Sequence, residues 1–261
     1  MFGIFDSGIG GLTVVKELFR VLPNYKILYF GDTAHAPYGT KGKETIIKYA
    51  IENTEFLIKK GAKIIIIACN TASAVATETL RKKFSVPIFE VINPAAKRAV
   101  KVTQNNKIGI IGTRTTIESR IYEKLIKRIN PKIQIFSYAC PLLVSLVEEG
   151  WFKKPETKRI VKRYLYPLKI KQIDTLILGC THYPLIKDLI QIKIGRRVRL
   201  VDSGEEVVKE VQKYLKENSG IERSLKKSQN HEFYFSDLNP RIREISSRWL
   251  KRSVKPKVAK I

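Results

Sequence analysis

The chain has 261 residues, of which 49 are Lys or Arg and 24 are Asp or Glu, so its net charge is +25. A hydrophobic content of 44% argues against intrinsic disorder, and no apolar run approaches the ~18–20 residues that cross a bilayer, so no membrane association is expected. Three cysteines are too few for a disulfide framework, which predicts a reducing, cytoplasmic location.

Short apolar, β-branched runs alternate with amphipathic stretches along the chain, a pattern typical of α/β proteins. The expected strands are residues 2–5, 26–30, 63–68, 86–90, 107–111, 132–138, 174–179 and 197–201. The expected helices are residues 12–22, 43–60, 72–84, 115–129, 156–169 and 205–216. A polar stretch then precedes a ninth strand, HEFYFS at 231–236, a final helix ending near Lys251 and a basic tail at 252–261 that we expect to fray.

The first eight strands fall into two sets that match in order and spacing. Phe2 and Lys107, which begin the two sets, are 105 residues apart, and Cys69 and Cys180, which follow the third strand of each set, are 111 apart. Runs such as KIIIIA and DTLILG are apolar on both faces, as in buried strands of parallel sheets. The sequence therefore predicts a duplicated α/β fold, with two similar parallel-sheet domains facing each other across a cleft.

The ninth strand has no counterpart in this repeat, and we expect it to join the sheet of the first domain. That domain would then be discontinuous. The predicted domains are residues 1–94 plus 205–261, and residues 95–204.

Reactive side chains follow the expected strands, where ligands bind in open α/β sheets. Cys69 and Cys180 occupy matched strand ends, next to helix N-terminal amides that stabilise a thiolate. Two thiols across one cleft can act as two bases: one removes a proton from one face of a carbon atom, and the other delivers a proton to the opposite face. Asp6 and His182 are expected to tune the two thiols. Cys140 has no matched partner, and we expect it to be a small buried hydrophobe.

Small polar groups near the strand ends fit an amino-acid substrate. Candidate side chains are those of Ser7, Asn70, Thr71, Thr116 and Thr181. Backbone amides in the glycine-rich segment 8–11 and at Gly39 could receive a carboxylate. The same residue types also serve as helix N-caps or turn residues, and the two roles are compatible. The glycines fit neither G-x-G-x-x-G nor the P-loop pattern, so no nucleotide cofactor is expected.

Six segments resemble the glutamate racemase family, within the aspartate/glutamate racemase superfamily. They are FDSGIGGL at 5–12, PYG at 37–39, ACNTAS at 68–73, IGTRTT at 111–116, CPLLVSLVEEG at 140–150 and GCTHYPL at 179–185. They occur in the order found in the family and cover nearly the whole chain. The resemblance implies a cofactor-independent isomerase that interconverts L- and D-glutamate and supplies D-glutamate for peptidoglycan in a bacterial cytoplasm.

The resemblance also implies roles for individual residues. Cys69 and Cys180 would be the acid/base pair, assisted by Asp6, Glu148 and His182. The implied substrate contacts are Asp6, Ser7, Tyr38, Gly39, Asn70, Thr71, Thr113, Thr116, Thr181 and His182. No metal or cofactor is implied, and we expect a homodimer.

Other functions stay open on the sequence alone. One is aspartate racemase, or a related cofactor-free racemase with the same two-thiol chemistry. Another is nucleic-acid binding, for which the charge of +25 is suitable; the basic residues are scattered, however, which indicates a solvated surface. A zinc site made of Cys69, Cys180 and His182 is a third alternative, although no C-x-x-C or H-x-x-x-H spacing pre-arranges its ligands.

Overall fold

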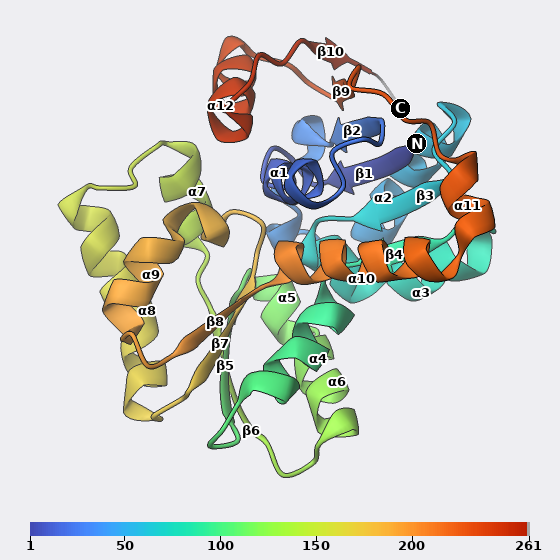
Figure 1. The fold of residues 1–261 in the computed structure, drawn as a ribbon. Coiled ribbons are helices and arrows are strands. Elements are labelled where there is room, and N and C mark those ends of the chain that lie inside the picture. Colours follow the sequence, from blue (N-terminus) through green and yellow to red (C-terminus); the bar gives the residue numbers. More distant parts are fainter. Residues whose placement is uncertain (260–261) are drawn as a thin grey trace.

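The computed structural model describes residues 1–259, whose strands form two parallel sheets (Figure 1). The first sheet has the order β10-β9-β2-β1-β3-β4, and the second has the order β6-β5-β7-β8. The strands of the first sheet are β1 (Phe2–Asp6), β2 (Ile27–Gly31), β3 (Ile64–Ile67), β4 (Ile88–Glu90), β9 (Glu232–Phe235) and β10 (Pro256–Val258). Those of the second are β5 (Lys107–Gly112), β6 (Gln134–Ala139), β7 (Thr175–Gly179) and β8 (Arg199–Asp202).

The two sheets share one topology. The order β2-β1-β3-β4 within the first sheet is repeated as β6-β5-β7-β8 in the second, and all of these pairs are parallel. This confirms the prediction of two similar parallel-sheet units. Strand β9 pairs with β2 in the register Leu28↔Glu232, so the ninth strand joins the first sheet as expected.

Helices cover both faces of the first sheet because its strands are apolar on both sides. Phe2 and Ile4 of β1 belong to one hydrophobic cluster and Phe5 to another, as the pleat of a strand requires. The helices before β5 are α1 (Leu12–Val21), α2 (Lys43–Lys59), α3 (Asn70–Lys83) and α4 (Ile92–Val102). Between β5 and β8 lie α5 (Arg114–Glu118), α6 (Ile121–Ile129), α7 (Leu142–Glu148), α8 (Pro155–Ile170) and α9 (Lys187–Ile194). The remaining helices are α10 (Ser203–Glu217), α11 (Ser219–Ser224) and α12 (Pro240–Leu250).

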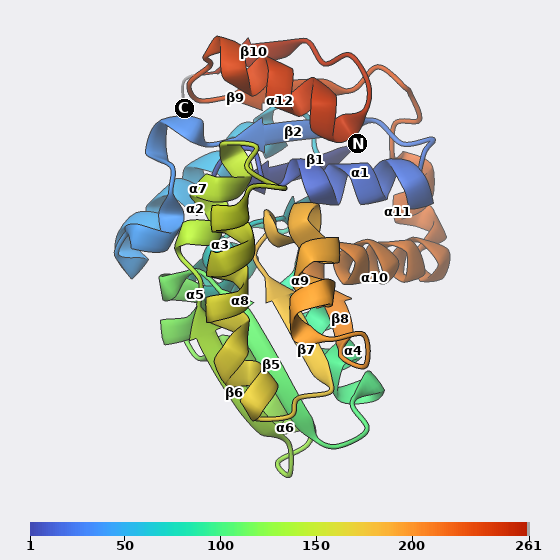
Figure 2. The ribbon, with the colours of Figure 1, turned by 90° about the vertical axis from the view of Figure 1, so that its left-hand side faces the viewer.

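The chain passes from one sheet to the other twice. After β4 it enters α4, which packs against α6 and β7 of the second sheet. After β8 it enters α10, which packs against both α1 and α4 and therefore lies at the junction of the two units (Figures 1 and 2). We call the first sheet with α1–α3 and α12 the first unit, and the second sheet with α4–α9 the second unit.

Three expectations differ from the structure. The tail does not fray within the described residues: β10 pairs with β9, Val254 is buried, and the Ala259 amide donates to the Phe235 carbonyl at 2.9 Å. The helix expected over 115–129 breaks into α5 and α6 because Arg120 adopts a left-handed conformation, with φ +54°. Helices α4, α7, α9 and α11 were not predicted. No helix in the described part of the chain is long and apolar enough to cross a membrane.

Candidate active site

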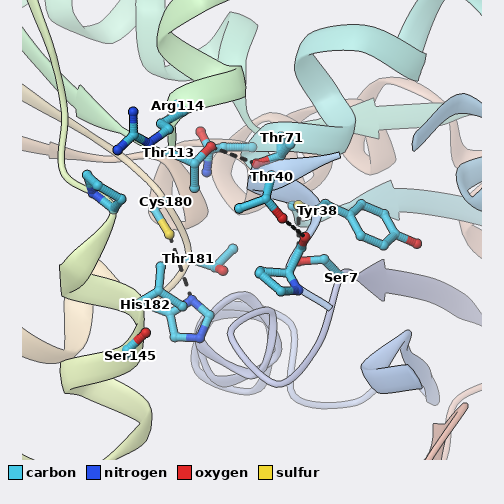
Figure 3. Close-up of a pocket in the computed structure, with 16 residues that line it drawn as sticks. Ser7, Tyr38, Thr40, Thr71, Thr113, Arg114, Ser145, Cys180, Thr181 and His182 are labelled. Carbon is cyan, nitrogen blue, oxygen red and sulfur yellow. Dashed lines mark hydrogen bonds between the residues drawn. The ribbon is translucent and has the colours of Figure 1, made fainter. Parts of the chain in front are cut away.

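A cavity of about 110 Å³ lies at the carboxyl ends of both sheets (Figure 3). Its walls include residues within two positions of the ends of β1, β3, β5 and β7, where open α/β sheets bind ligands. Both Cys69 and Cys180 line it. The volume is well below the ~300–1,000 Å³ of pockets for drug-sized ligands, which suits a small molecule.

Cys69 lies between β3 and α3, where it caps the helix. The Ala72 amide donates to its Sγ at 3.5 Å, and the thiol in turn donates to Oγ of Ser7, also at 3.5 Å. Burial and the nearby Asp6 carboxylate raise the pKa of the Cys69 thiol to about 12, although the two hydrogen bonds oppose this shift. Cys69 is therefore a neutral thiol in the unliganded site at neutral pH.

Cys180 follows β7 and has an imidazole as its neighbour. Nδ1 of His182 lies 3.7 Å from Sγ of Cys180 (Figure 3), and Nε2 lies 2.9 Å from Oε1 of Glu148. Burial lowers the pKa of His182, but the contacts with Cys180 and Glu148 outweigh this effect and raise that pKa above its usual range. A protonated imidazole beside Cys180 can stabilise negative charge that develops on its sulfur during a proton transfer.

Asp6 ends β1 and has no exposed surface. Its Oδ2 accepts the Gly8 amide at 3.1 Å, whereas its Oδ1 has no hydrogen-bond partner among residues 1–259. Burial raises the pKa of this carboxyl group, while the hydrogen bond and the charge of His182 oppose the shift. Burying a carboxyl group that lacks a full set of hydrogen bonds costs free energy. Groups with shifted pKa values cluster at functional sites, so the position of Asp6 near a thiol indicates a functional role.

Hydroxyl and amide groups form a second wall of the cavity. Oγ1 of Thr71 lies 2.9 Å from Oγ1 of Thr113, and Oγ1 of Thr113 lies 2.9 Å from Oγ1 of Thr116. Asn70 and Thr181 also line the cavity. These groups can offer hydrogen bonds to the carboxylate and amino groups of a small acid.

The two units meet closely at two glycines. A Cβ on Gly10 would lie 2.3 Å from Oγ1 of Thr181 and 2.5 Å from Cε1 of His182, and a Cβ on Gly39 would lie 2.9 Å from Cβ of Thr113. Only glycine fits at such distances. The cavity is therefore formed by both units together.

Most of the residues expected to bind a substrate or to assist the cysteines line this cavity, but two expected substrate contacts and one expected assisting residue do not. Those that line it are Ser7, Tyr38, Gly39, Asn70, Thr71, Thr113, Thr181 and His182, together with Cys69 and Cys180. Asp6, Glu148 and Thr116 stand behind the lining and reach it through their neighbours. The hydroxyl of Tyr38 points away from the cavity (Figure 3) and donates to Oδ2 of Asp32.

Six lining residues were not singled out from the sequence. They are Pro37, Thr40, Arg114, Pro141, Val144 and Ser145. All but Thr40 lie inside the six segments that resemble the racemase family. That resemblance was the only signal in the sequence that could have pointed to them. Val144 and Ser145 lie on α7, and without that helix the sequence gives no reason to place them at the cavity.

The zinc alternative has no counterpart in the structure. No group of three or more His, Cys, Asp or Glu side chains over residues 1–259 is placed to hold a metal ion, including the set of Cys69, Cys180 and His182.

The chain is similar to characterised families over nearly its whole length. The family model for Asp/Glu/hydantoin racemases matches residues 11–211. A glutamate racemase of Geobacter metallireducens is 45% identical over 248 residues, covering 95% of this chain and 92% of that protein. A glutamate racemase of Enterococcus faecalis is 46% identical over 248 residues, covering 95% and 91% of the two chains.

Solved structures of glutamate racemases are also similar to this chain. A glutamate racemase isoform from Bacillus anthracis superposes with a TM-score of 0.94 at 37% identity, covering 100% of this chain and 97% of that one. A Francisella tularensis glutamate racemase in complex with D-glutamate gives a TM-score of 0.90 at 38% identity, with coverages of 100% and 96%. An aspartate racemase from Picrophilus torridus, at 18% identity and a TM-score of 0.57, shares the fold.

Proposed function

Because the chain belongs to the Asp/Glu/hydantoin racemase family, we propose that it is a cofactor-independent glutamate racemase, an isomerase that interconverts L- and D-glutamate. The observation that carries the proposal is that Cys69 and Cys180, at matched strand ends of the two units, line one cavity. A carbon atom between two sulfurs can lose its proton to one and gain a proton from the other, which inverts its configuration. Glutamate racemases that cover most of the chain at 42–46% identity support glutamate as the substrate.

The reaction moves one proton at each sulfur. In one direction the Cys180 thiolate takes the α-proton of glutamate, and the Cys69 thiol donates its own proton to the opposite face of the same carbon. After this turnover Cys180 is a thiol and Cys69 a thiolate. The starting state is restored when Cys180 loses a proton to solvent and Cys69 gains one from it, or when the reverse reaction takes place. Each direction therefore balances with no group other than the two sulfurs and the substrate.

The neighbours of the sulfurs assist in different ways. The His182 imidazolium, held by Glu148, stabilises negative charge on Cys180. Asp6 raises the pKa of Cys69, which keeps that thiol protonated before the reaction and makes its thiolate a strong base in the reverse direction. Asp6 and Glu148 lie behind the cavity lining and His182 lies within it, so all three can act on the sulfurs.

The charge of the cavity suits a dicarboxylate. Arg114 lines it, and no Asp or Glu side chain in the described chain does so. Asn70, Thr71, Thr113 and Thr181 would donate hydrogen bonds to the carboxylates and accept them from the ammonium group. Preorganised donors around the α-carboxylate would stabilise the carbanion-like transition state.

We further propose how the protein is organised. We assign residues 1–94 plus 205–261 to one domain and residues 95–204 to the other, with the cavity between them. The enzyme would act as a homodimer in the cytoplasm, where D-glutamate is used to build peptidoglycan.

Racemisation is tested most directly by polarimetry of purified protein with L-glutamate and no added cofactor. In D₂O, deuterium should appear at the α-carbon of the product, since the returning proton comes from a thiol that exchanges with solvent. Optical rotation that stays constant would overturn the proposal. Parallel assays with aspartate and hydantoins separate the related racemases, and a salt-dependent gel shift tests nucleic-acid binding.

A further inference from the structure

Asn70 is the first residue of α3, lines the cavity and is only 2% exposed. Its Oδ1 accepts a hydrogen bond from the Tyr122 hydroxyl at 2.7 Å, and its Nδ2 donates to Oγ of Ser203 at 3.2 Å. Tyr122 lies on α6 of the second unit, and Ser203 begins α10 at the junction. The backbone of Asn70 therefore belongs to the first unit, while both hydrogen-bond partners of its carboxamide, Tyr122 and Ser203, lie outside that unit.

The single proton of Ser203 sets the orientation of this carboxamide. Ser203 donates that proton to the Leu178 carbonyl at 3.2 Å, so its Oγ can only accept from Asn70. The nitrogen of the Asn70 amide must therefore face Ser203, and its oxygen must face Tyr122. The amide nitrogen carries two hydrogens. Ser203 takes one of them, and the other is available to a ligand in the cavity.

We propose that Tyr122 and Ser203 are positioning residues, which lock the Asn70 carboxamide so that it presents an N–H donor to a carboxylate of glutamate. This inference rests on the proposed function, because the ligand is glutamate. Both residues are 2% exposed, and neither lines the cavity, so they act through Asn70 and do not touch the substrate. A carboxamide free to turn over would present its carbonyl oxygen as well, which repels a carboxylate.

The network also joins the two units at the substrate. The hydroxyl of Tyr122, on α6 of the second unit, reaches Asn70 of the first unit only when the two units are in contact. The donor for the carboxylate is therefore oriented only in the assembled cavity, and a separation of the units would release it.

The test is a double-mutant cycle with Tyr122→Phe and Asn70→Ala, in which kcat/KM for glutamate is measured. Tyr122→Phe keeps the ring and removes only the hydroxyl, so we expect kcat/KM to fall about tenfold or more. In the Asn70→Ala background the same change should have an effect of less than about twofold, because its target is gone. Calorimetric binding of glutamate to the same four proteins gives a readout that does not need turnover.

Tyr25→Phe is the matched control, since it removes a hydroxyl that bonds Glu222 away from the cavity and should leave kcat/KM unchanged. The same cycle is repeated with Ser203→Ala in place of Tyr122→Phe. If circular dichroism shows that Tyr122→Phe is unfolded, the cycle with Ser203→Ala decides the test. Equal losses in both backgrounds, or no loss in either, would overturn the positioning inference while wild-type racemisation stands. An inactive wild-type protein would instead remove the proposed function, and the inference with it.

Discussion

Oε1 of Glu148 lies 2.9 Å from Nε2 of His182, while Nδ1 of the same ring lies 3.7 Å from Sγ of Cys180. The buried imidazole is thus engaged at both nitrogens, by a carboxylate on α7 and by the sulfur after β7. Cys69 has a hydroxyl and a backbone amide as its partners instead. The environments of the two sulfurs therefore differ: Cys180 lies beside an imidazolium, whereas Cys69 is a neutral thiol.

In Glu148→Gln, activity should begin to fall at a lower alkaline pH than in the wild type. The carboxylate of Glu148 helps to raise the pKa of His182, so its removal lowers that pKa. The imidazolium that supports the Cys180 thiolate is then lost at a lower pH. The measurement is the pH profile of kcat/KM for glutamate, whose alkaline limb should move toward neutral pH.

Glu149→Gln is the matched control for this profile. Glu149 is the next residue along the chain, and its carboxylate pairs with Arg241 rather than with His182. Its replacement should leave the alkaline limb in place. An alkaline limb that shifts equally in both variants would mean that Glu148 acts through overall charge and not through His182.

Cys69→Ser and Cys180→Ser should each lower racemisation by about 10²–10⁴-fold, the usual contribution of a positioned acid or base. A hydroxyl holds its proton far more tightly than a thiol at neutral pH, so neither serine can replace its cysteine as a base. Cys140→Ser is the comparison, because Cys140 is buried and does not line the cavity. Full racemisation by either active-site variant would remove that cysteine from the mechanism.

The sequence predicted the sheets well because their strands carry a strong local signal. Runs such as that of β3 are apolar on both faces, and the repeat of four strands follows from spacing alone. The tail was predicted wrongly because its ordering depends on a partner distant in sequence: Val258 pairs with Phe235 of β9. Helix α7 has only seven residues, too few for a clear periodic pattern.

The site shows the same division between local and long-range information. Cys69 and Cys180 were found because reactive groups cluster at strand ends in this type of fold. The contact of Tyr122 with Asn70 spans 52 residues, and that of Asn70 with Ser203 spans 133. No pattern along the chain marks such pairs, since only the tertiary fold brings Tyr122 of α6 and Ser203 of α10 to the first residue of α3.

Gly10→Ala should impair catalysis more than folding. The added Cβ would lie 2.3 Å from Oγ1 of Thr181 and 2.5 Å from Cε1 of His182, so the two units must move apart or the imidazole must turn. Either change disturbs the contact between His182 and Cys180. We expect kcat/KM to fall by at least about tenfold, as misplacement of reacting groups by an ångström can cost ~10²-fold.

Gly42→Ala provides the comparison, because a Cβ at Gly42 meets no atom within 4 Å. Its kcat/KM should match the wild type, while its melting temperature should fall slightly, because Gly42 is the N-cap of α2 and alanine is a poorer cap than glycine. Wild-type activity in Gly10→Ala would show that the close approach at this glycine is not needed for the site.

Asp6→Asn should slow racemisation and increase the free energy of unfolding, and the size of that increase should depend on pH. Burial raises the pKa of Asp6 in the folded protein above the ~3.9 of an unfolded chain. Ionisation of this group therefore costs stability, and the cost grows as the pH rises from the unfolded pKa toward the folded pKa and then stays constant. Asparagine cannot ionise, so the free energy of unfolding of the variant should increase relative to wild type over that pH range. Urea unfolding at several pH values measures this difference, while the polarimetric assay should show slower racemisation. Two stability curves that run parallel from acid to neutral pH would mean that the pKa of Asp6 is the same in the folded and unfolded protein, and that burial does not raise it.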